Sequence, residues 1–262
     1  MRFLIPCLIA VVVGYLGLGV IVAAIEPSLV FRPRNTPLED CRLPPSVRLI
    51  DFDGERGLFT EGGGRGLLIF YHGNSGTACS WRFLGANHAS ALGFDTLAME
   101  YPGYGGDPRD TPPSADTIRS LVERTHRWTQ ARYSNIVAMG FSLGTGAASY
   151  QASLSGIEKV VLFAPYQSLF ELAQNYGYPF SRFWFQNDLD NVDTLIKAQA
   201  PVHIIYGGRD KIVPPESSEA LIKRLRGAGV QITDTKLPDA GHIGLFGRAR
   251  INEILQAVLD DR

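Results

Sequence analysis

The sequence has little net charge, few cysteines and no clustered metal ligands. Its 25 Lys and Arg residues nearly balance its 26 Asp and Glu residues, which leaves a formal net charge of -1 over 262 residues. A chain this close to neutral has no overall electrostatic attraction to nucleic acid. The five histidines are scattered and show no HExxH-like pairing, so we expect no metal site, no cofactor and no nucleic-acid partner.

Three cysteines are too few for the disulfide scaffold of a small secreted domain. Cys7 lies in an apolar N-terminal stretch, which leaves Cys41 and Cys79 for the rest of the chain. These two could pair in an oxidising compartment, but the sequence leaves their pairing open. With 45% hydrophobic and 19% charged residues, the chain has the composition of a globular protein with a sizeable core.

The N-terminus carries one long uncharged run. No charged side chain occurs from Phe3 to Ile25, and Arg2 and Glu26 bound the run. As a helix it would reach about 34 Å, enough to cross a hydrocarbon core of about 30 Å. The sequence therefore predicts that residues 1–25 are a single-pass membrane anchor.

Two other interpretations of this run are weaker. A cleaved signal peptide would use the small residues Val22–Ala24 as its cleavage site, but its apolar region is usually only about 7–15 residues long. A buried core helix is disfavoured by the length and position of the run. Arginines flank it on both sides, so the positive-inside rule does not orient it. We expect the rest of the chain on the exported, extracytoplasmic side.

The remaining chain predicts one α/β domain. Residues 26–45 are proline-rich and are expected to form a linker, and 46–262 alternate strand-like and helical patterns. The short, mostly apolar runs expected as strands are 47–52, 67–71, 94–99, 136–139, 160–164, 202–206 and 232–236. The expected helices are 77–91, 114–131, 143–154, 216–226 and 248–259. This alternation predicts a doubly wound, mostly parallel sheet that binds ligands at the carboxyl ends of its strands.

Residues 165–199 interrupt the alternation with a segment rich in Tyr, Phe and Trp. It leaves one strand end and returns to the next, so it is expected to form a cap over the sheet edge. Its rings either line an apolar acyl pocket or only pack the segment onto the domain.

Ser142 lies in the sequence GFSLG, between a predicted strand and a helix of small residues. A reversal this tight strains the backbone at the central residue, and Gly140 and Gly144 relieve crowding on either side. The pattern predicts a nucleophilic serine at a strand end. The backbone N–H of Leu143 would then point toward an oxyanion formed by attack on a carbonyl.

A serine hydroxyl needs a base and the base needs an orienting carboxylate. His242 and Asp210 each follow a predicted strand, so both are expected at the sheet edge that carries Ser142. Asp239 is the second candidate for the carboxylate, because three residues within one loop give poor geometry. The aspartates of the cap rank lower: Asp188, Asp190 and Asp193.

A second oxyanion donor is expected in the loop after an earlier strand. The sequence YHGNSG follows the run 67–71, and the backbone N–H of Asn74 is the candidate donor, with Gly73 allowing close approach. His72 is expected to have a structural role. The order Ser, Asp, His along the chain is the order used by one particular fold.

Together, YHGNSG, EYPGYGGD, GFSLGTG, YGGRDKIVP and AGH resemble the α/β-hydrolase superfamily over nearly the whole chain after residue 45. Within it, the chain looks like membrane-anchored, lysophospholipase-like or acyl-thioesterase-like serine hydrolases. The resemblance implies a Ser142, Asp210, His242 triad with oxyanion donors at Leu143 and Asn74. The runs 100–107 and 243–247 depart from many relatives, which affects the expected pocket and leaves the chemistry unchanged.

We therefore expect a membrane-tethered serine hydrolase that cleaves a hydrophobic, lipid-like acyl ester or thioester through an acyl-enzyme. A serine peptidase or amidase of the same fold is the alternative within enzymes. A non-catalytic binding protein on a hydrolase scaffold is the alternative from another class; such proteins usually lose a triad residue, and this chain keeps all three candidates.

Overall fold

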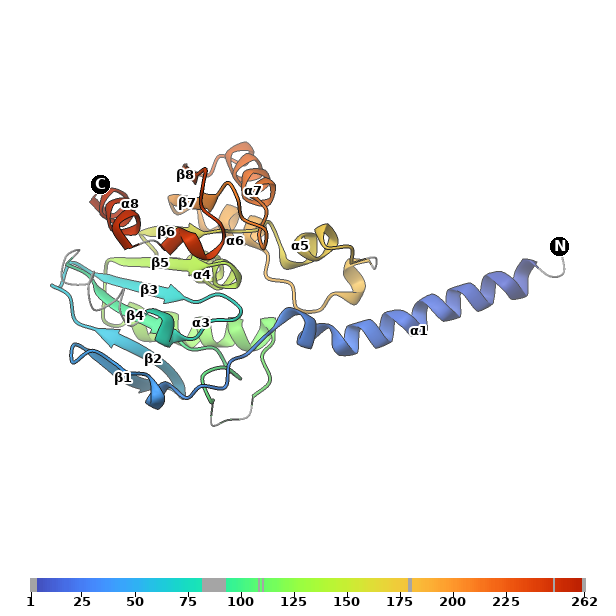
Figure 1. Ribbon diagram of the computed structural model, residues 1–262, viewed down its shortest axis with the longest axis horizontal. Helices are drawn as coiled ribbons and strands as arrows, with labels where there is room; N and C mark the ends of the chain where they lie inside the picture. Colours follow the sequence, from blue (N-terminus) through green and yellow to red (C-terminus); the bar gives the residue numbers. More distant parts are fainter. Residues whose placement is uncertain are drawn as a thin grey trace.

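The computed structural model describes residues 4–81, 93–107, 109, 111–178, 181–246 and 248–260. One eight-stranded sheet orders its strands β1-β2-β4-β3-β5-β6-β7-β8 (Figure 1). The strands are β1 Val47–Phe52, β2 Glu55–Thr60, β3 Leu67–Tyr71, β4 Asp95–Met99, β5 Ile136–Phe141, β6 Lys159–Phe163, β7 Val202–Gly207 and β8 Ile232–Leu237. β2 pairs antiparallel with β1 and β4, and every other pair is parallel. The predicted mostly parallel sheet is confirmed.

Strand β2 was not predicted from the sequence. Asp53 and Gly54 both have positive φ, 52° and 75°, and they form a two-residue hairpin between β1 and β2. The strand expected over 47–52 ends directly before this dipeptide, and no return strand was expected after it. In fact such a dipeptide favours a tight hairpin, and the chain returns at once along the edge of the sheet.

The helices that cover the sheet begin and end close to the predicted residues. They are α3 Ala115–Gln130, α4 Leu143–Ser153, α7 Pro215–Gly227 and α8 Arg248–Asp260. Ser114 caps α3 by accepting from the backbone N–H of Thr117, whose side chain returns the bond. Of the expected helix 77–91, only the turn η2 Ala78–Trp81 and the residue before it lie within the described residues.

The segment 165–199 contains α5 Leu169–Asn175, the single turn η3 Arg182–Trp184 and α6 Asn191–Ala198. Helix α6 packs against α4 and α7, because its apolar face, including Val192 and Leu195, is buried. It therefore belongs to the layer of helices on the sheet. The excursion over the sheet edge, which we call the cap, is residues 168–190 and is shorter than expected.

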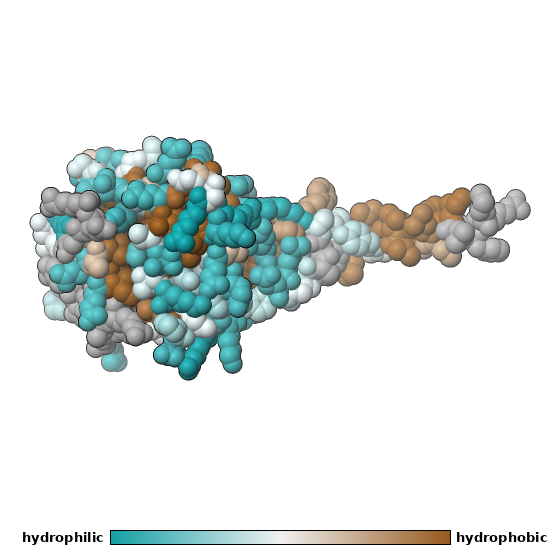
Figure 2. Space-filling view, turned by 90° about the horizontal axis from the view of Figure 1, so that it is seen from above, coloured by the Kyte–Doolittle hydropathy of each residue, from teal (hydrophilic) through white to brown (hydrophobic). Residues whose placement is uncertain are grey.

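Helix α1 Leu4–Val30 projects from the domain (Figure 1). Its free part is apolar on the face that Figure 2 shows. It is the one helix of the described residues that is long and apolar enough to be a membrane span or a signal anchor. The helix runs five residues past the expected end at Ile25, through Pro27. Glu26 can continue it because its carboxylate is buried in the domain and accepts from the backbone N–H and Nδ2 of Asn187 at 3.1 and 2.5 Å.

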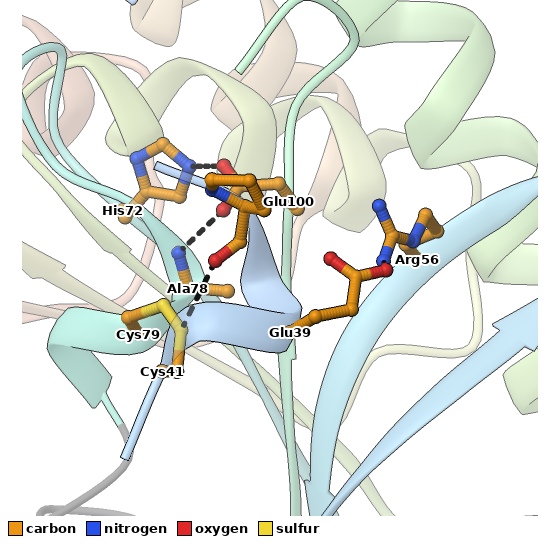
Figure 3. Close-up of a disulfide and its surroundings, with 8 residues drawn as sticks. Glu39, Cys41, Arg56, His72, Ala78, Cys79 and Glu100 are labelled. Carbon is orange, nitrogen blue, oxygen red and sulfur yellow. Dashed lines mark hydrogen bonds and ion pairs between the residues drawn. A yellow bond between two sulfur atoms is a disulfide. The ribbon is translucent and has the colours of Figure 1, made fainter. Parts of the chain in front are cut away.

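The linker after α1 is tied to the domain by a disulfide. Cys41 and Cys79 are joined across 38 residues, with their Cα atoms 5.9 Å apart (Figure 3). Cys41 follows the turn η1 Leu38–Asp40, in which Leu38 is fully buried, and Cys79 lies in η2. The linker therefore packs along the domain as a fixed part of the structure.

Candidate active site

Ser142 occupies a strained turn between β5 and α4. Its φ of 53° and ψ of -118° are strongly disfavoured for a residue with a side chain. A Cβ on Gly140 would overlap the carbonyl oxygen of Gly144, and a Cβ on Gly144 would overlap that of Tyr71. Glycine is thus required at both positions for the turn to close.

The surroundings of Ser142 hold this turn at the sheet edge. Its backbone N–H donates to the carbonyl of Phe163 at the end of β6, at 2.9 Å. Leu143 is the first residue of α4, and the first N–H groups of a helix have no partner within the helix. The N–H of Leu143 is therefore positioned for an oxyanion role.

His242 and Asp210 meet at the same edge. Nδ1 of His242 and Oδ2 of Asp210 are 2.6 Å apart, although 32 residues separate them in the sequence. Asp210 follows β7 and His242 follows β8, and their side chains are only 2% and 10% exposed. The imidazole also packs against the ring of Phe141, with centroids 4.7 Å apart, which places it beside the turn that bears Ser142.

The second oxygen of Asp210 is held by its own loop. Oδ1 accepts from the backbone N–H groups of Ile212 and Val213 at 2.8 and 2.9 Å. Two backbone donors and the imidazole together satisfy the hydrogen-bonding capacity of the buried carboxylate. This arrangement can fix the orientation and the tautomer of His242.

The other candidate carboxylates lie elsewhere. Asp239 pairs with Arg209 at 2.8 Å, and both side chains are largely exposed. Asp188 and Asp190 both pair with Arg182 within the cap. Asp193 lies in the first turn of α6, where its backbone N–H donates to the side chain of the N-cap, Asp190.

Asn74 is fixed by its side chain to the end of α1. Its Nδ2 donates to the carbonyl of Val30 at 2.5 Å, and its Oδ1 accepts from the backbone N–H of Arg32 at 2.8 Å. The hydroxyl of Tyr104 donates to the same Oδ1, at 2.8 Å. Burial raises the pKa of the Tyr104 phenol well above its ordinary value, so this hydroxyl remains a donor at neutral pH. Both polar atoms of the side chain thus have partners, which leaves the backbone N–H as the candidate oxyanion donor.

His72 and Glu100 form a second, fully buried pair behind this loop (Figure 3). Nε2 of His72 lies 2.8 Å from Oε1 of Glu100, and Nδ1 lies 2.8 Å from the carbonyl of Gly73. The other oxygen of Glu100 accepts from the N–H of Ala78 at 3.0 Å. The structural role expected for His72 agrees with these contacts. The role of Glu100 was missed, and its only signal was a carboxylate directly after a buried strand.

Among the described residues, no group of three or more His, Cys, Asp or Glu side chains could hold a metal ion. The polar groups gathered at the edge are instead a serine, an imidazole–carboxylate pair and backbone donors. Such a set can take a proton from an alcohol and stabilise an oxyanion.

Comparisons with known proteins agree with this architecture. The alpha/beta hydrolase family matches residues 67–187. An uncharacterised protein of Mycobacterium tuberculosis is 30% identical over 168 residues, which cover 62% of this chain and 59% of the relative. The chain thus spans less than two thirds of that relative's length.

Solved structures share the fold at lower identity. An esterase of Pyrococcus furiosus aligns with a TM-score of 0.63 and 16% identity, over 87% of this chain and 98% of its own. A membrane phospholipase A, described as a bacterial virulence factor, aligns with a TM-score of 0.62 and 18% identity, over 99% of this chain and 98% of its own. The chain therefore has the α/β-hydrolase fold, and the solved structures that share it include an esterase and a phospholipase.

Proposed function

We propose that this protein is a serine hydrolase that cleaves a carboxylic ester or thioester of a hydrophobic, lipid-like acyl group. The observation that carries the proposal is the buried His242–Asp210 pair, packed beside the strained turn that bears Ser142. The esterase and phospholipase among the solved neighbours support the class of reaction.

The first half of the reaction forms an acyl-enzyme. Oγ of Ser142 attacks the carbonyl carbon while its proton passes to Nε2 of His242, whose Nδ1–H is held by Asp210. The oxyanion accepts hydrogen bonds from the backbone N–H groups of Leu143 and Asn74. The tetrahedral intermediate collapses, the C–O or C–S bond to the leaving group breaks, and His242 returns the proton to the departing alkoxide or thiolate.

The second half consumes water. His242 removes a proton from a water molecule, the hydroxide attacks the acyl carbon, and the same donors stabilise the second oxyanion. Collapse releases the carboxylic acid and restores the hydroxyl of Ser142. No cofactor takes part in this proposed sequence.

Exposed apolar side chains support a hydrophobic substrate. Ile212 and Ile243, which follow Asp210 and His242 closely in the sequence, are 54% and 78% exposed. Tyr176 of the cap reaches the same loop, where its hydroxyl donates to the carbonyls of Lys211 and Ile212. An apolar acyl chain would bury these surfaces on binding.

We also propose that α1 is a membrane anchor and that the domain lies on the extracytoplasmic side. The helix has the length and composition of a single span. The Cys41–Cys79 disulfide supports the side, since disulfides persist in oxidising compartments.

Replacing the nucleophile tests the reaction directly. Ser142→Ala in the full chain should reduce turnover of p-nitrophenyl esters to background and abolish covalent labelling by a fluorophosphonate. Ser153→Ala, at the end of the same helix α4, is the matched control and should leave both unchanged. Labelling retained by Ser142→Ala would contradict the proposed nucleophile, and wild-type protein that never labels would favour a binding protein.

A further inference from the structure

Part of the cap lies against the apolar helix. A Cβ on Gly19 would come within 2.5 Å of the Trp184 ring, so this indole of η3 rests on the backbone of α1. Residues 5–18, N-terminal to this contact, are exposed, whereas Gly19 is buried. Gly19 is therefore the first buried residue of α1 among the described residues.

The exposed part of α1 before Gly19 is too short to cross a bilayer alone. Fourteen residues from 5 to 18 reach about 21 Å, whereas a hydrocarbon core is about 30 Å thick. The uncharged run from Phe3 to Ile25 is only slightly longer than the roughly 20 residues that one span requires. Counted from Phe3, about twenty residues end at Val22, which is roughly 4.5 Å further along the helix than Gly19. Any tilt of the helix requires more residues and moves this boundary further along it.

The outer face of α1 remains apolar beyond Gly19. Ile21, Ile25 and Leu29 follow one another at intervals of four residues and are 58%, 47% and 60% exposed. Their inner neighbours, including Gly19 and Glu26, are covered by the domain. The stripe continues the free apolar surface that Figure 2 shows, so the same surroundings should cover both.

We propose that the cap turn η3 is immersed in the outer part of the bilayer beside α1. This inference rests on the proposed role of α1 as a membrane anchor. At the depth set by Gly19, Trp184 and the neighbouring Phe183 lie several ångströms below the polar boundary. Phe183 is 80% exposed and packs edge-on against Trp184, with ring centroids 5.1 Å apart.

The side chains around η3 suit that position. Aromatic rings are favoured at the membrane interface, where interfacial segments sit about 5–10 Å deep. Arg182, the first residue of η3, is paired with Asp188 and Asp190, at 2.5 and 3.1 Å. Its guanidinium would therefore enter the membrane interface together with carboxylate partners.

The immersion brings the active site to the membrane. The parallel strands end on the side from which α1 projects (Figure 1), and Tyr176 connects the cap to the loop after Asp210. The immersion would therefore place the edge of the sheet that bears Ser142 on the side of the domain that faces the membrane.

Depth-dependent quenching of tryptophan fluorescence tests the immersion. The full chain would be reconstituted in phosphatidylcholine vesicles, with or without bromine at acyl positions 6 and 7. Because Trp184 is one of three tryptophans, the bromolipid should remove about one third of the emission. Trp184→Phe should abolish this loss. Trp128→Phe should retain it, since Trp128 stacks on Phe52 away from the cap.

Two further measurements keep the outcome clear. Moving the reporter by one residue, with Trp184→Phe and Phe183→Trp together, should restore the quenching. Ser142→Ala should quench like wild type, so a failed enzymatic assignment does not affect this test. Equal quenching of wild type and Trp184→Phe would overturn the proposal. So would cross-linking of Ile25→Cys, in a Cys7→Ser background, that survives dilution with lipid, because a second copy would then cover the outer face of α1.

Discussion

The two oxygens of the Asp210 carboxylate have different partners. Oδ1 is held by two backbone N–H groups of its own loop, and only Oδ2 faces His242. In an asparagine at this position, the carbonyl oxygen would remain on the two donors, and the amide NH₂ would face the imidazole.

This arrangement predicts a specific defect for Asp210→Asn. The new NH₂ would donate to Nδ1 of His242 and hold the imidazole proton on Nε2, which could then not accept the proton of Ser142. We expect kcat to fall by about 10⁴-fold, with little change in KM or in thermal stability. Steady-state hydrolysis of a short p-nitrophenyl ester gives kcat and KM, and a thermal melt gives the stability.

Asp239→Asn is the matched control for this substitution. Asp239 is closer to His242 in sequence, but it pairs with Arg209 at the exposed surface. Its replacement should leave kcat unchanged. A loss of activity in Asp239→Asn with none in Asp210→Asn would reverse the assignment.

Sequence reasoning can rank such residues but cannot place them. The position of Asp210 after a buried run favoured it over Asp239, because the ends of parallel strands meet at one edge. The His72–Glu100 pair was not predicted, because nothing in a single sequence links a histidine after β3 to a glutamate after β4 until the strands are known to be neighbours.

At the scale of elements, the loop that carries Asn74 is connected to the end of α1. Three hydrogen bonds hold the Asn74 side chain, and two of them go to the backbone at Val30 and Arg32. The candidate oxyanion donor is thus positioned by the segment that leaves the anchor.

We expect Asn74→Ala to keep the backbone N–H and yet lower kcat by about 10- to 100-fold. That is less than the ~10²–10³-fold cost of losing a donor outright, because the loop loses only its support. KM for a short ester should change by less than about twofold, since the side chain faces away from the proposed oxyanion. The separate kcat and KM values from steady-state kinetics provide the check.

Two substitutions at Arg32 isolate the backbone contact. Arg32→Ala keeps the N–H that reaches Asn74 and should behave like wild type. Arg32→Pro removes this donor and should lower kcat in the same direction as Asn74→Ala. Wild-type turnover in both Asn74→Ala and Arg32→Pro would show that the connection does not position the donor.

The elements themselves were largely predictable where their patterns were strong. The apolar runs predicted the parallel strands. The predicted start of α3 at residue 114 coincides with its N-cap, Ser114. β2 was missed because four of its six residues are polar or glycine and its turn resembles a strand end. The end of α1 was placed too early because Glu26 ends the apolar run, and only the folded domain supplies Asn187 to bury its carboxylate.

At the scale of the whole molecule, the Cys41–Cys79 disulfide closes a loop that contains the end of the linker, β1, β2, β3 and the Asn74 loop. It joins the segment that follows α1 to η2, close to the buried His72–Glu100 pair (Figure 3).

Removing this bond should destabilise the protein. Closure of a loop between cysteines separated by 38 positions corresponds to about 4 kcal/mol in the chain-entropy account. For a domain of this size, that is a fall in Tm of about 8–15 °C. Thermal melts of Cys41→Ser in detergent, and of wild type with and without reductant, measure the change. Cys7→Ser should melt like wild type, because Cys7 is unpaired and exposed on α1. Superimposable melts for Cys41→Ser and wild type would refute the expectation.

The seating of α1 on the domain has a practical consequence for anyone who wants a water-soluble fragment. A cut just after Arg32 would spare Ser142, Asp210 and His242, yet it would strip Asn74 of two partners and leave Asn187 without the Glu26 carboxylate. Turnover recorded on such a fragment would understate what the intact enzyme achieves. Fragments should therefore start no later than residue 26, and their kinetics should be compared with those of the complete polypeptide in lipid.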